Sequence, residues 1–356
     1  MDRWEIAEYR LANQLIKTPT SAPLEKIVSH MGALQAQAYQ DSLWALGLRS
    51  KSATHEDAED AISSKRIIRT WAMRGTWHLV PPGEVRWMLS LYPEEDDIKE
   101  YQRRYHGLTE STLKKGLELI PTAFKGKESL TYNEIGAALA RSGIPALKKK
   151  SAQQHIIRRA GKRGIICFTE RSGGRPAFSL FERTVPKTEH LSRSRILERL
   201  AEIYFSSHGP ATAADFAWWS GIRMRDARMG LEGAKRRLKK VEGDSTYWLG
   251  RNAKVKVGES AFLLPSFDEY LISYKDRNAV LDPRHYKKVA AGSTFWFKPI
   301  VVLDGIVEGT WSKTLKKDNV LIHLEPFGKI TSAQRQAVEL AAERYEAFIG
   351  KKVIVK

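Results

Sequence analysis

Two glutamines near the N-terminus, Gln35 and Gln37, are the residues whose type and spacing first suggest chemistry. Each amide side chain offers hydrogen-bond donors and an acceptor but carries no titratable group. Residues two apart lie on nearly opposite sides of a continuous helix, so the two amides converge only if the helix ends there. Asp41 and Ser42 are cap-like residues at which a helix can restart, so a break is expected before them. From the residues alone, the favoured alternative is that one glutamine caps its own helix.

The charge of the chain limits its partners. There are 59 Lys and Arg residues against 41 Asp and Glu residues, a net charge of +18, and the pI is near 9.8. Such a surface attracts polyanions through its long-range field, which makes nucleic acid the leading partner class. The alternative is that the lysines only keep the protein soluble.

Composition indicates an ordered globular protein. The 356 residues are 42% hydrophobic and 28% charged, which is enough for two or three cores. No charged-then-apolar leader follows Met1, and no run approaches the roughly 20 apolar residues of a membrane span. We therefore expect a cytoplasmic, nucleoid-associated protein with no membrane partner, and a monomer because no segment resembles a dimerisation helix.

No cofactor or metal is expected. The single cysteine, Cys167, lies in an apolar run, where a buried structural thiol is favoured over a nucleophile. One cysteine excludes disulfides and Cys-based zinc sites. The nine histidines contain no i, i+4 pair carrying a Glu, and no glycine-rich segment ends in the Lys-Ser/Thr of a phosphate loop.

The first third of the chain predicts helices followed by a hairpin. An apolar stripe predicts a helix that includes Leu34, and another helix is expected over residues 56–63. Residues 67–73 and 76–80 read as two strands turned at Arg74-Gly75. This order is typical of a winged helix, in which Arg74 and Thr76 can touch a phosphate and His78 can reach a damaged strand. The alternative for His78 is a hydrogen-bonded core residue.

The same pattern recurs twice. Residues 130–180 predict a capped helix, a basic helix and a hairpin, and residues 194–249 predict a third copy. In the basic helix Ile156, Ile157 and Ala160 are expected to face inward. Its candidate DNA-binding residues are Lys149, Lys150, His155, Arg158, Arg159, Lys162 and Arg163. One basic helix often does no more than cover a core, but three tandem units suit a protein that wraps a duplex.

The last third changes to strand signals. Runs at residues 262–265, 294–297, 300–311 and 320–324, with a hairpin turn at Asp304-Gly305, predict a small β-barrel. A helix over residues 332–348 is expected to pack on it through Ala333, Ala337, Leu340, Ala341 and Tyr345. The predicted fold class is α+β, with three tandem winged helices and a C-terminal β-barrel. The predicted domains are residues 1–95, 96–190, 191–252 and 253–356.

Four segments together resemble the bacterial winged-helix family of AlkZ-type DNA glycosylases. They are GALQAQ, TWAMRGTWHLVP, LLPSFDEYLISYKDR and IVVLDGIVEGTW, in this order, and the resemblance extends from about residue 3 to residue 350. It implies a C-shaped DNA-binding scaffold and an enzyme that excises alkylated purines, including crosslinked ones. It also implies a catalytic Q-Φ-Q motif, which this chain matches at Gln35 and Gln37 with Ala36 between them.

Glutamines suit this chemistry when the leaving base is already cationic. A purine alkylated at a ring nitrogen needs no enzymatic acid, so a Gln carbonyl can orient the attacking water and face the developing sugar cation. We therefore expect a monofunctional glycosylase that acts on double-stranded DNA. The alternative is a non-catalytic winged-helix DNA-binding protein or transcription regulator. The sequence leaves open which adduct is the natural one, whether the base is flipped out, and whether the role is self-resistance to a toxin.

The acidic pair Asp268-Glu269 is predicted to be structural. Adjacent carboxylates on an apolar flank usually bind backbone amides or a nearby arginine, here Arg277.

Overall fold

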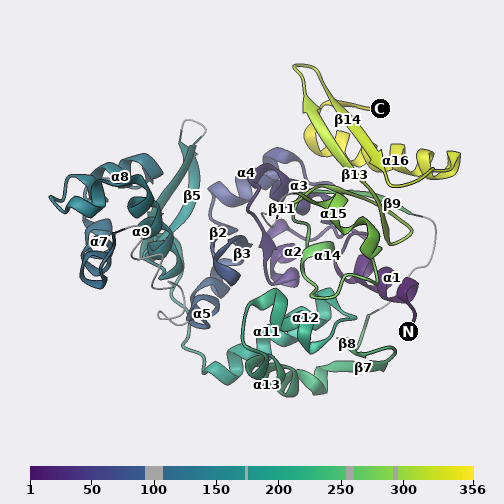
Figure 1. Ribbon diagram of the computed structural model, residues 1–356, viewed down its shortest axis with the longest axis horizontal. Coiled ribbons are helices and arrows are strands. Elements are labelled where there is room, and N and C mark those ends of the chain that lie inside the picture. The colour runs from purple at the N-terminus through teal and green to yellow at the C-terminus, as the bar shows by residue number, and fades with distance from the viewer. Residues whose placement is uncertain (93–106, 173–174, 254–259, 292–295) are drawn as a thin grey trace. The chain divides into compact units, whose positions relative to one another are not determined.

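The computed structural model describes residues 1–92, 107–172, 175–253, 260–291 and 296–356 (Figure 1). The chain divides into two compact units: unit 1 joins residues 1–60 to residues 192–356, and unit 2 comprises residues 61–191. The mixed α+β class predicted from the sequence is confirmed. The four domain boundaries and the number of winged helices stay predictions.

Unit 2 follows the element order of a winged helix over residues 110–180. Three helices, α7 to α9, precede the hairpin β5–β6, and the short strand β4 pairs with β6. A second hairpin, β2–β3, pairs with β5 through Arg69 and Phe168. The bounds are β2 Ile68–Trp71, β3 Trp77–Val80, α5 Val85–Ser90, α7 Glu110–Ala123, β4 Leu130–Thr131, α8 Tyr132–Ala140, α9 Lys150–Lys162, β5 Ile166–Ser172, β6 Arg175–Leu180 and α10 Phe181–Thr184.

Local signals explain these helices. The predicted capping box at the start of α8 is present, because Thr131 accepts from the Glu134 amide and Glu134 accepts from the Thr131 amide. Along α9 the predicted inward residues Ile156, Ile157 and Ala160 are fully buried. The same core cluster contains α7 and β6 residues, so the basic helix is fixed by its apolar face.

Unit 1 contains two runs of helices that are distant in sequence. The bounds are α1 Arg3–Asn13, α2 Leu24–Met31, β1 Leu34–Gln35, α3 Tyr39–Arg49, α4 His55–Ser63, α11 Arg193–His208, α12 Ala213–Ser220, α13 Met224–Ala234, β7 Leu238–Glu242 and β8 Thr246–Gly250. The helices α1 and α2 both contact α11. The order α11, α12, α13 and hairpin β7–β8 is the one expected for the third predicted copy.

The C-terminal part of unit 1 is an open, curled sheet, so the predicted β-barrel is corrected to a half-barrel. Its strand order is β15-β14-β13-β12-β9, which leaves β15 and β9 as edges. The predicted hairpin turn is confirmed: Asp304 (φ 48°) and Gly305 (φ 82°) both adopt the left-handed conformation of a tight turn. The bounds are β9 Ala261–Leu264, α14 Glu269–Ile272, α15 Tyr286–Val289, β10 Ala290–Ala291, β11 Trp296–Phe297, β12 Ile300–Leu303, β13 Ile306–Leu315, β14 Asn319–Pro326, α16 Ser332–Ile349 and β15 Lys352–Val355. Residues 294 and 295 of one predicted strand lie outside the described residues.

The last helix, α16, forms where expected but presents a different face. It contacts β9 and β15 (yellow in Figure 1). Ala341 and Tyr345 are buried as predicted, whereas Leu340 is 57% exposed. Val338, Ala342 and Phe348 are the buried residues that the predicted stripe missed. Phe348 packs against Trp44 of α3, with ring centroids 5.1 Å apart, and this long-range contact sets the rotation of the helix.

A buried ion pair joins α3 to the start of α14. The Arg49 guanidinium donates to both carboxylate oxygens of Asp268, at 2.9 Å each, and both side chains are almost fully buried. Asp268 also accepts the backbone N–H of Tyr270 at 3.0 Å, so it caps α14. A bidentate pair of this kind fixes orientation as well as distance.

We expect Asp268→Asn to lower the free energy of unfolding by about 3–5 kcal/mol, because it leaves the Arg49 guanidinium buried without its counter-charge. The double variant Arg49→Met/Asp268→Asn removes the stranded charge and keeps a capping oxygen, so it is expected to lose less than the sum of the two single variants. Urea unfolding of the three variants measures this. Strict additivity of the losses would contradict a coupled buried pair.

Candidate active site

Gln35 lies in a break between two helices, as the sequence predicted, but the break begins earlier: Leu34, expected in the first helix, belongs to the extended segment. Helix α2 ends at Met31, Gly32 follows with φ 76°, and Leu34–Gln35 is extended before α3 begins at Tyr39. A Cβ on Gly32 would lie 2.7 Å from Ile203, so a side chain at this position is excluded by close packing as well as by conformation. Neither glutamine caps a helix: the C-cap of α2 is Gly32 and the N-cap of α3 is Ala38. The helix-cap alternative is therefore wrong.

The two glutamines differ in exposure. Gln35 is 9% exposed, and its side-chain oxygen Oε1 is buried without a hydrogen-bond partner among the described residues. Gln37 is exposed. A buried amide oxygen that lacks a donor is costly unless a water or ligand supplies one.

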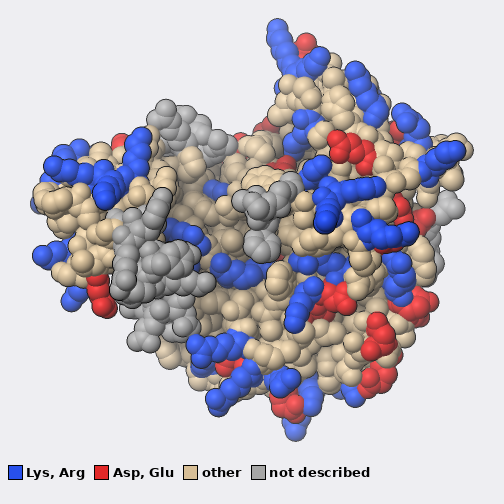
Figure 2. All heavy atoms as spheres, in the orientation of Figure 1, with Lys and Arg blue, Asp and Glu red and all other residues tan. Residues whose placement is uncertain are grey.

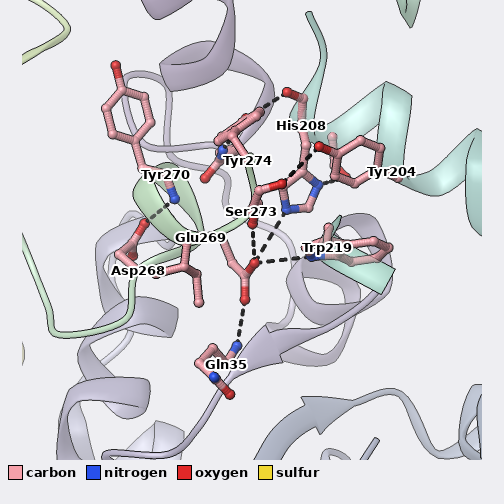
Figure 3. A network of polar contacts seen from close by, with 12 residues as sticks. Gln35, Tyr204, His208, Trp219, Asp268, Glu269, Tyr270, Ser273 and Tyr274 are labelled. Atoms are coloured by element: carbon pink, nitrogen blue, oxygen red, sulfur yellow. Dashed lines mark hydrogen bonds and ion pairs between the residues drawn. The ribbon is translucent and has the colours of Figure 1, made fainter. Parts of the chain in front are cut away.

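The backbone of Gln35 is held by a buried carboxylate. Its N–H donates to Glu269 Oε1 at 2.7 Å, and Glu269 is 1% exposed. The other carboxylate oxygen accepts from Trp219 Nε1 at 3.1 Å and from the Ser273 hydroxyl. Figure 3 shows these groups converging on Glu269 from β1, from α12 and from the residue that follows α14. The segment that carries Gln35 is thus tied to residues more than 180 positions away in the sequence.

A buried histidine completes this network. His208 Nε2 lies 3.8 Å from Glu269 Oε2, and its Nδ1 lies 2.8 Å from the Ser207 hydroxyl. The imidazole stacks on Tyr204, with ring centroids 5.0 Å apart. Burial lowers the pKa of His208 and outweighs the Glu269 carboxylate, which raises it. The ring is therefore neutral at physiological pH.

A second layer holds these groups in place. The Tyr204 hydroxyl donates to the Ser273 carbonyl at 3.0 Å, and the Tyr274 hydroxyl donates to the His208 carbonyl at 2.7 Å. Gln14 bridges Tyr274 and Arg49, at 2.9 and 3.2 Å. The network consequently extends to the Arg49–Asp268 pair described above.

The acidic pair binds the kinds of group that the sequence predicted, but the arginine is a different one. Asp268 and Glu269 do bind backbone amides and an arginine. The arginine is Arg49 rather than Arg277, whose Nε donates to the Leu271 carbonyl at 2.9 Å. Because Arg49 lies 219 positions before Asp268, no local pattern identifies it.

The candidate DNA-binding residues of unit 2 gather on one helix and one turn. Arg158 donates to the Gly75 carbonyl at 3.1 Å, and a Cβ on Gly75 would lie 2.5 Å from Lys162 Nζ. The turn between β2 and β3, which carries Arg74 and Thr76, therefore lies against α9. Figure 2 shows Lys and Arg side chains over the α7–α9 end of unit 2. The exposed members of the predicted set are Lys149, Lys150, Arg158 and Arg163, and the partly exposed members are Arg74, Thr76, His155 and Lys162.

Two residues of the predicted DNA-binding set, His78 and Arg159, are buried. His78 is 0% exposed, and its Nδ1 lies 2.9 Å from the Thr76 carbonyl. This is the hydrogen-bonded core position that the sequence left as the alternative. Arg159 is 8% exposed, because it falls on the same face of α9 as Ile156 and Ala160. A phosphate contact needs an accessible guanidinium or imidazole, which neither position offers.

The remaining reactive groups are structural. Cys167 is a buried free thiol, and burial raises its pKa to about 12. The part of the chain that the structure describes contains no group of three or more His, Cys, Asp or Glu residues placed to hold a metal ion. Within that same part, none of the helices combines the length and apolarity of a membrane span.

Comparison with known proteins identifies the family. The model of the DNA glycosylase AlkZ-like family matches residues 28–348. An interstrand DNA cross-link repair glycosylase of Streptomyces sahachiroi is 23% identical over 327 residues, which is 86% of each chain. The structure of the Streptomyces sahachiroi DNA glycosylase AlkZ is similar over 100% of both chains, with a TM-score of 0.82 and 21% identity. The family match covers both the break at Gln35 and the segment around Glu269, and the chain belongs to the AlkZ-like DNA glycosylase family.

Proposed function

We propose that this protein hydrolyses the N-glycosidic bond of cationic alkylated purines in double-stranded DNA, with water held by Gln35 and Gln37. The observation that carries the proposal is the buried Gln35 Oε1, an acceptor without a donor among the residues that the structure describes. In the proposed reaction, a water molecule admitted with the damaged duplex donates to that oxygen and is oriented by it. The name of the Streptomyces relative supports interstrand crosslinks as a further substrate.

The reaction balances without an acid or a metal. Water oxygen bonds to C1′ of the sugar, and the glycosidic bond breaks with its electron pair passing to the base. That pair neutralises the ring charge of the alkylated purine, so the base leaves without protonation. An amide is too weak a base to keep a proton, and the proton of the attacking water passes to solvent. The strand itself stays intact.

The amide dipole also stabilises the transition state. As the bond breaks, positive charge develops on the sugar, and a carbonyl oxygen directed at it is favourable in a site with little water. Gln37 is exposed and gives the second amide its access to the DNA. The exposed basic residues of α9 bind the phosphates of the duplex, which positions the DNA without reading sequence.

The protein acts as a monomer in the cytoplasm, associated with the nucleoid.

Removal of both amides tests the assignment of the catalytic pair. We expect Gln35→Ala/Gln37→Ala to lower the single-turnover release of a cationic methylated purine from duplex DNA by about 10²–10⁴-fold, because the water loses its orientation. The dissociation constant for the same duplex is expected to change less than about threefold. Gln336→Ala, on the exposed face of α16, is the control. Unchanged release by the double variant would contradict the assignment, and no release by the wild type despite tight binding would favour a non-catalytic DNA-binding protein.

The pH dependence of release tests the absence of a titrating catalytic group. Neither amide ionises, and the lowered pKa of His208 keeps that imidazole neutral above its usual value. The ratio of the enzymatic rate to spontaneous loss of the same base is therefore expected to stay within about threefold between about pH 6.5 and 9. A bell-shaped ratio would show that a general acid or base takes part.

The salt dependence of binding tests the basic surface of α9. We expect Lys149→Ala and Arg158→Ala each to weaken binding equally for damaged and undamaged duplexes. Each is also expected to reduce the slope of log K against log salt by about 1, because one fewer counterion is released. Lys329→Ala, an exposed lysine on the segment before α16, is the matched control. If the slope is unchanged in both variants, the duplex does not bind at α9.

A further inference from the structure

We propose that Glu269 is a positioning residue for the reaction, which fixes the direction of the Gln35 amide by binding the Gln35 backbone N–H. This inference rests on the proposed function, because it assigns a role to a residue that acts through Gln35. Glu269 itself is 1% exposed and lies behind the Gln35 backbone, so it orients the amide without touching the substrate (Figure 3).

The two carboxylate oxygens of Glu269 have separate tasks. Oε1 accepts the Gln35 N–H at 2.7 Å. Oε2 accepts from Trp219 and Ser273 and lies 3.8 Å from the His208 ring. The donors to Oε2 fix the carboxylate plane, and the plane then fixes where Oε1 meets the Gln35 backbone. A hydrogen bond to a carboxylate is stronger than one to a neutral oxygen, so this contact restrains the Gln35 backbone more than a bond to a carbonyl would.

The segment that carries Gln35 needs such an anchor. It has left helix α2 at Gly32 and has not yet entered α3 at Tyr39, so Gln35 lies outside any helical hydrogen-bond ladder. Gly32 has no side chain to restrict its backbone. A shift of about 1 Å in a group that positions a reactant costs roughly 10²-fold in rate. The hydrogen bond to Glu269 holds the backbone of Gln35 itself, where a displacement of the amide would begin.

Glu269 is in turn held by the rest of unit 1. It is the first residue of α14, next to Asp268, whose carboxylate is bound on both oxygens by Arg49. Trp219 comes from α12, and its ring packs 4.9 Å from Tyr204 of α11. The two oxygens of Glu269 accept from three buried donors, the Gln35 N–H, the Trp219 Nε1–H and the Ser273 hydroxyl, so an apolar residue here would leave all three without an acceptor. Of these three contacts, the one to Gln35 leads directly to the candidate site.

The test separates positioning from support of the fold by comparing Glu269→Gln with Thr310→Val. Glu269→Gln keeps the shape but gives the side chain one acceptor and one donor group, so either Gln35 or Trp219 meets a donor instead of an acceptor. Thr310→Val removes a buried hydroxyl of the same unit, which donates to Glu325 at 2.8 Å, and leaves the Glu269 network in place. Both variants are compared with wild type at a temperature where circular dichroism shows all three folded. The readouts are the dissociation constant for a duplex carrying one cationic methylated purine and the single-turnover release rate.

We expect Glu269→Gln to lower the release rate by about 10²-fold with binding unchanged within about threefold, and Thr310→Val to lose less than about threefold in both. On a Gln35→Ala background, Glu269→Gln is expected to cost nothing further, since it acts through the amide that is already absent. Equal losses in Glu269→Gln and Thr310→Val, or additive losses with Gln35→Ala, would overturn the positioning role. Full activity of Gln35→Ala would instead overturn the proposed function, so the two failures are distinct.

Discussion

The hydrogen bond from the Gln35 backbone N–H to the buried Glu269 carboxylate is the constraint on which the candidate site depends. It joins a break between two N-terminal helices to a segment more than 200 residues later. Because Glu269 is also bound by Trp219 and Ser273, and Asp268 by Arg49, residues in or beside α3, α12 and α14 combine to fix two residues of extended chain. A site built this way is stiff although the residue that it presents lies outside a helix.

The chemistry matches what such a site can provide. The network offers oriented dipoles and a neutral imidazole, and the two amides proposed to meet the substrate carry no titratable group. This suits a leaving group that already bears a positive charge and is poor for a neutral base, which needs an acid to leave. In the proposed function, specificity for alkylated purines follows from the substrate's own charge. In the same proposal, the basic surface of α9 supplies affinity without selecting a base, since phosphate contacts carry no sequence information.

The sequence predicted those features that depend on neighbouring residues. The break around Gln35, the capping box of α8, the inward face of α9 and the Asp304-Gly305 turn are all set by local pattern, and each is confirmed. Features set by distant contacts were missed. The sequence predicted that Leu340 is buried, but it is exposed, and Phe348 of the same helix packs against Trp44 instead. The sequence also predicted Arg277 as the partner of Asp268, but the partner is Arg49. The role of Glu269 had only one signal in the sequence, its place in the segment SFDEY by which the chain resembles its family. No local sequence pattern predicts that a carboxylate accepts a hydrogen bond from a backbone N–H 234 positions earlier.

The most direct test of glycosidic hydrolysis is mass-spectrometric analysis of the products formed by excess wild-type protein on a duplex with one cationic methylated purine. We expect the methylated purine to appear as the free base, and the strand to stay intact until alkali cleaves it at the abasic site. A base that stays attached to a tightly bound duplex, or a strand cut without alkali, would contradict hydrolysis of the glycosidic bond by water held at Gln35.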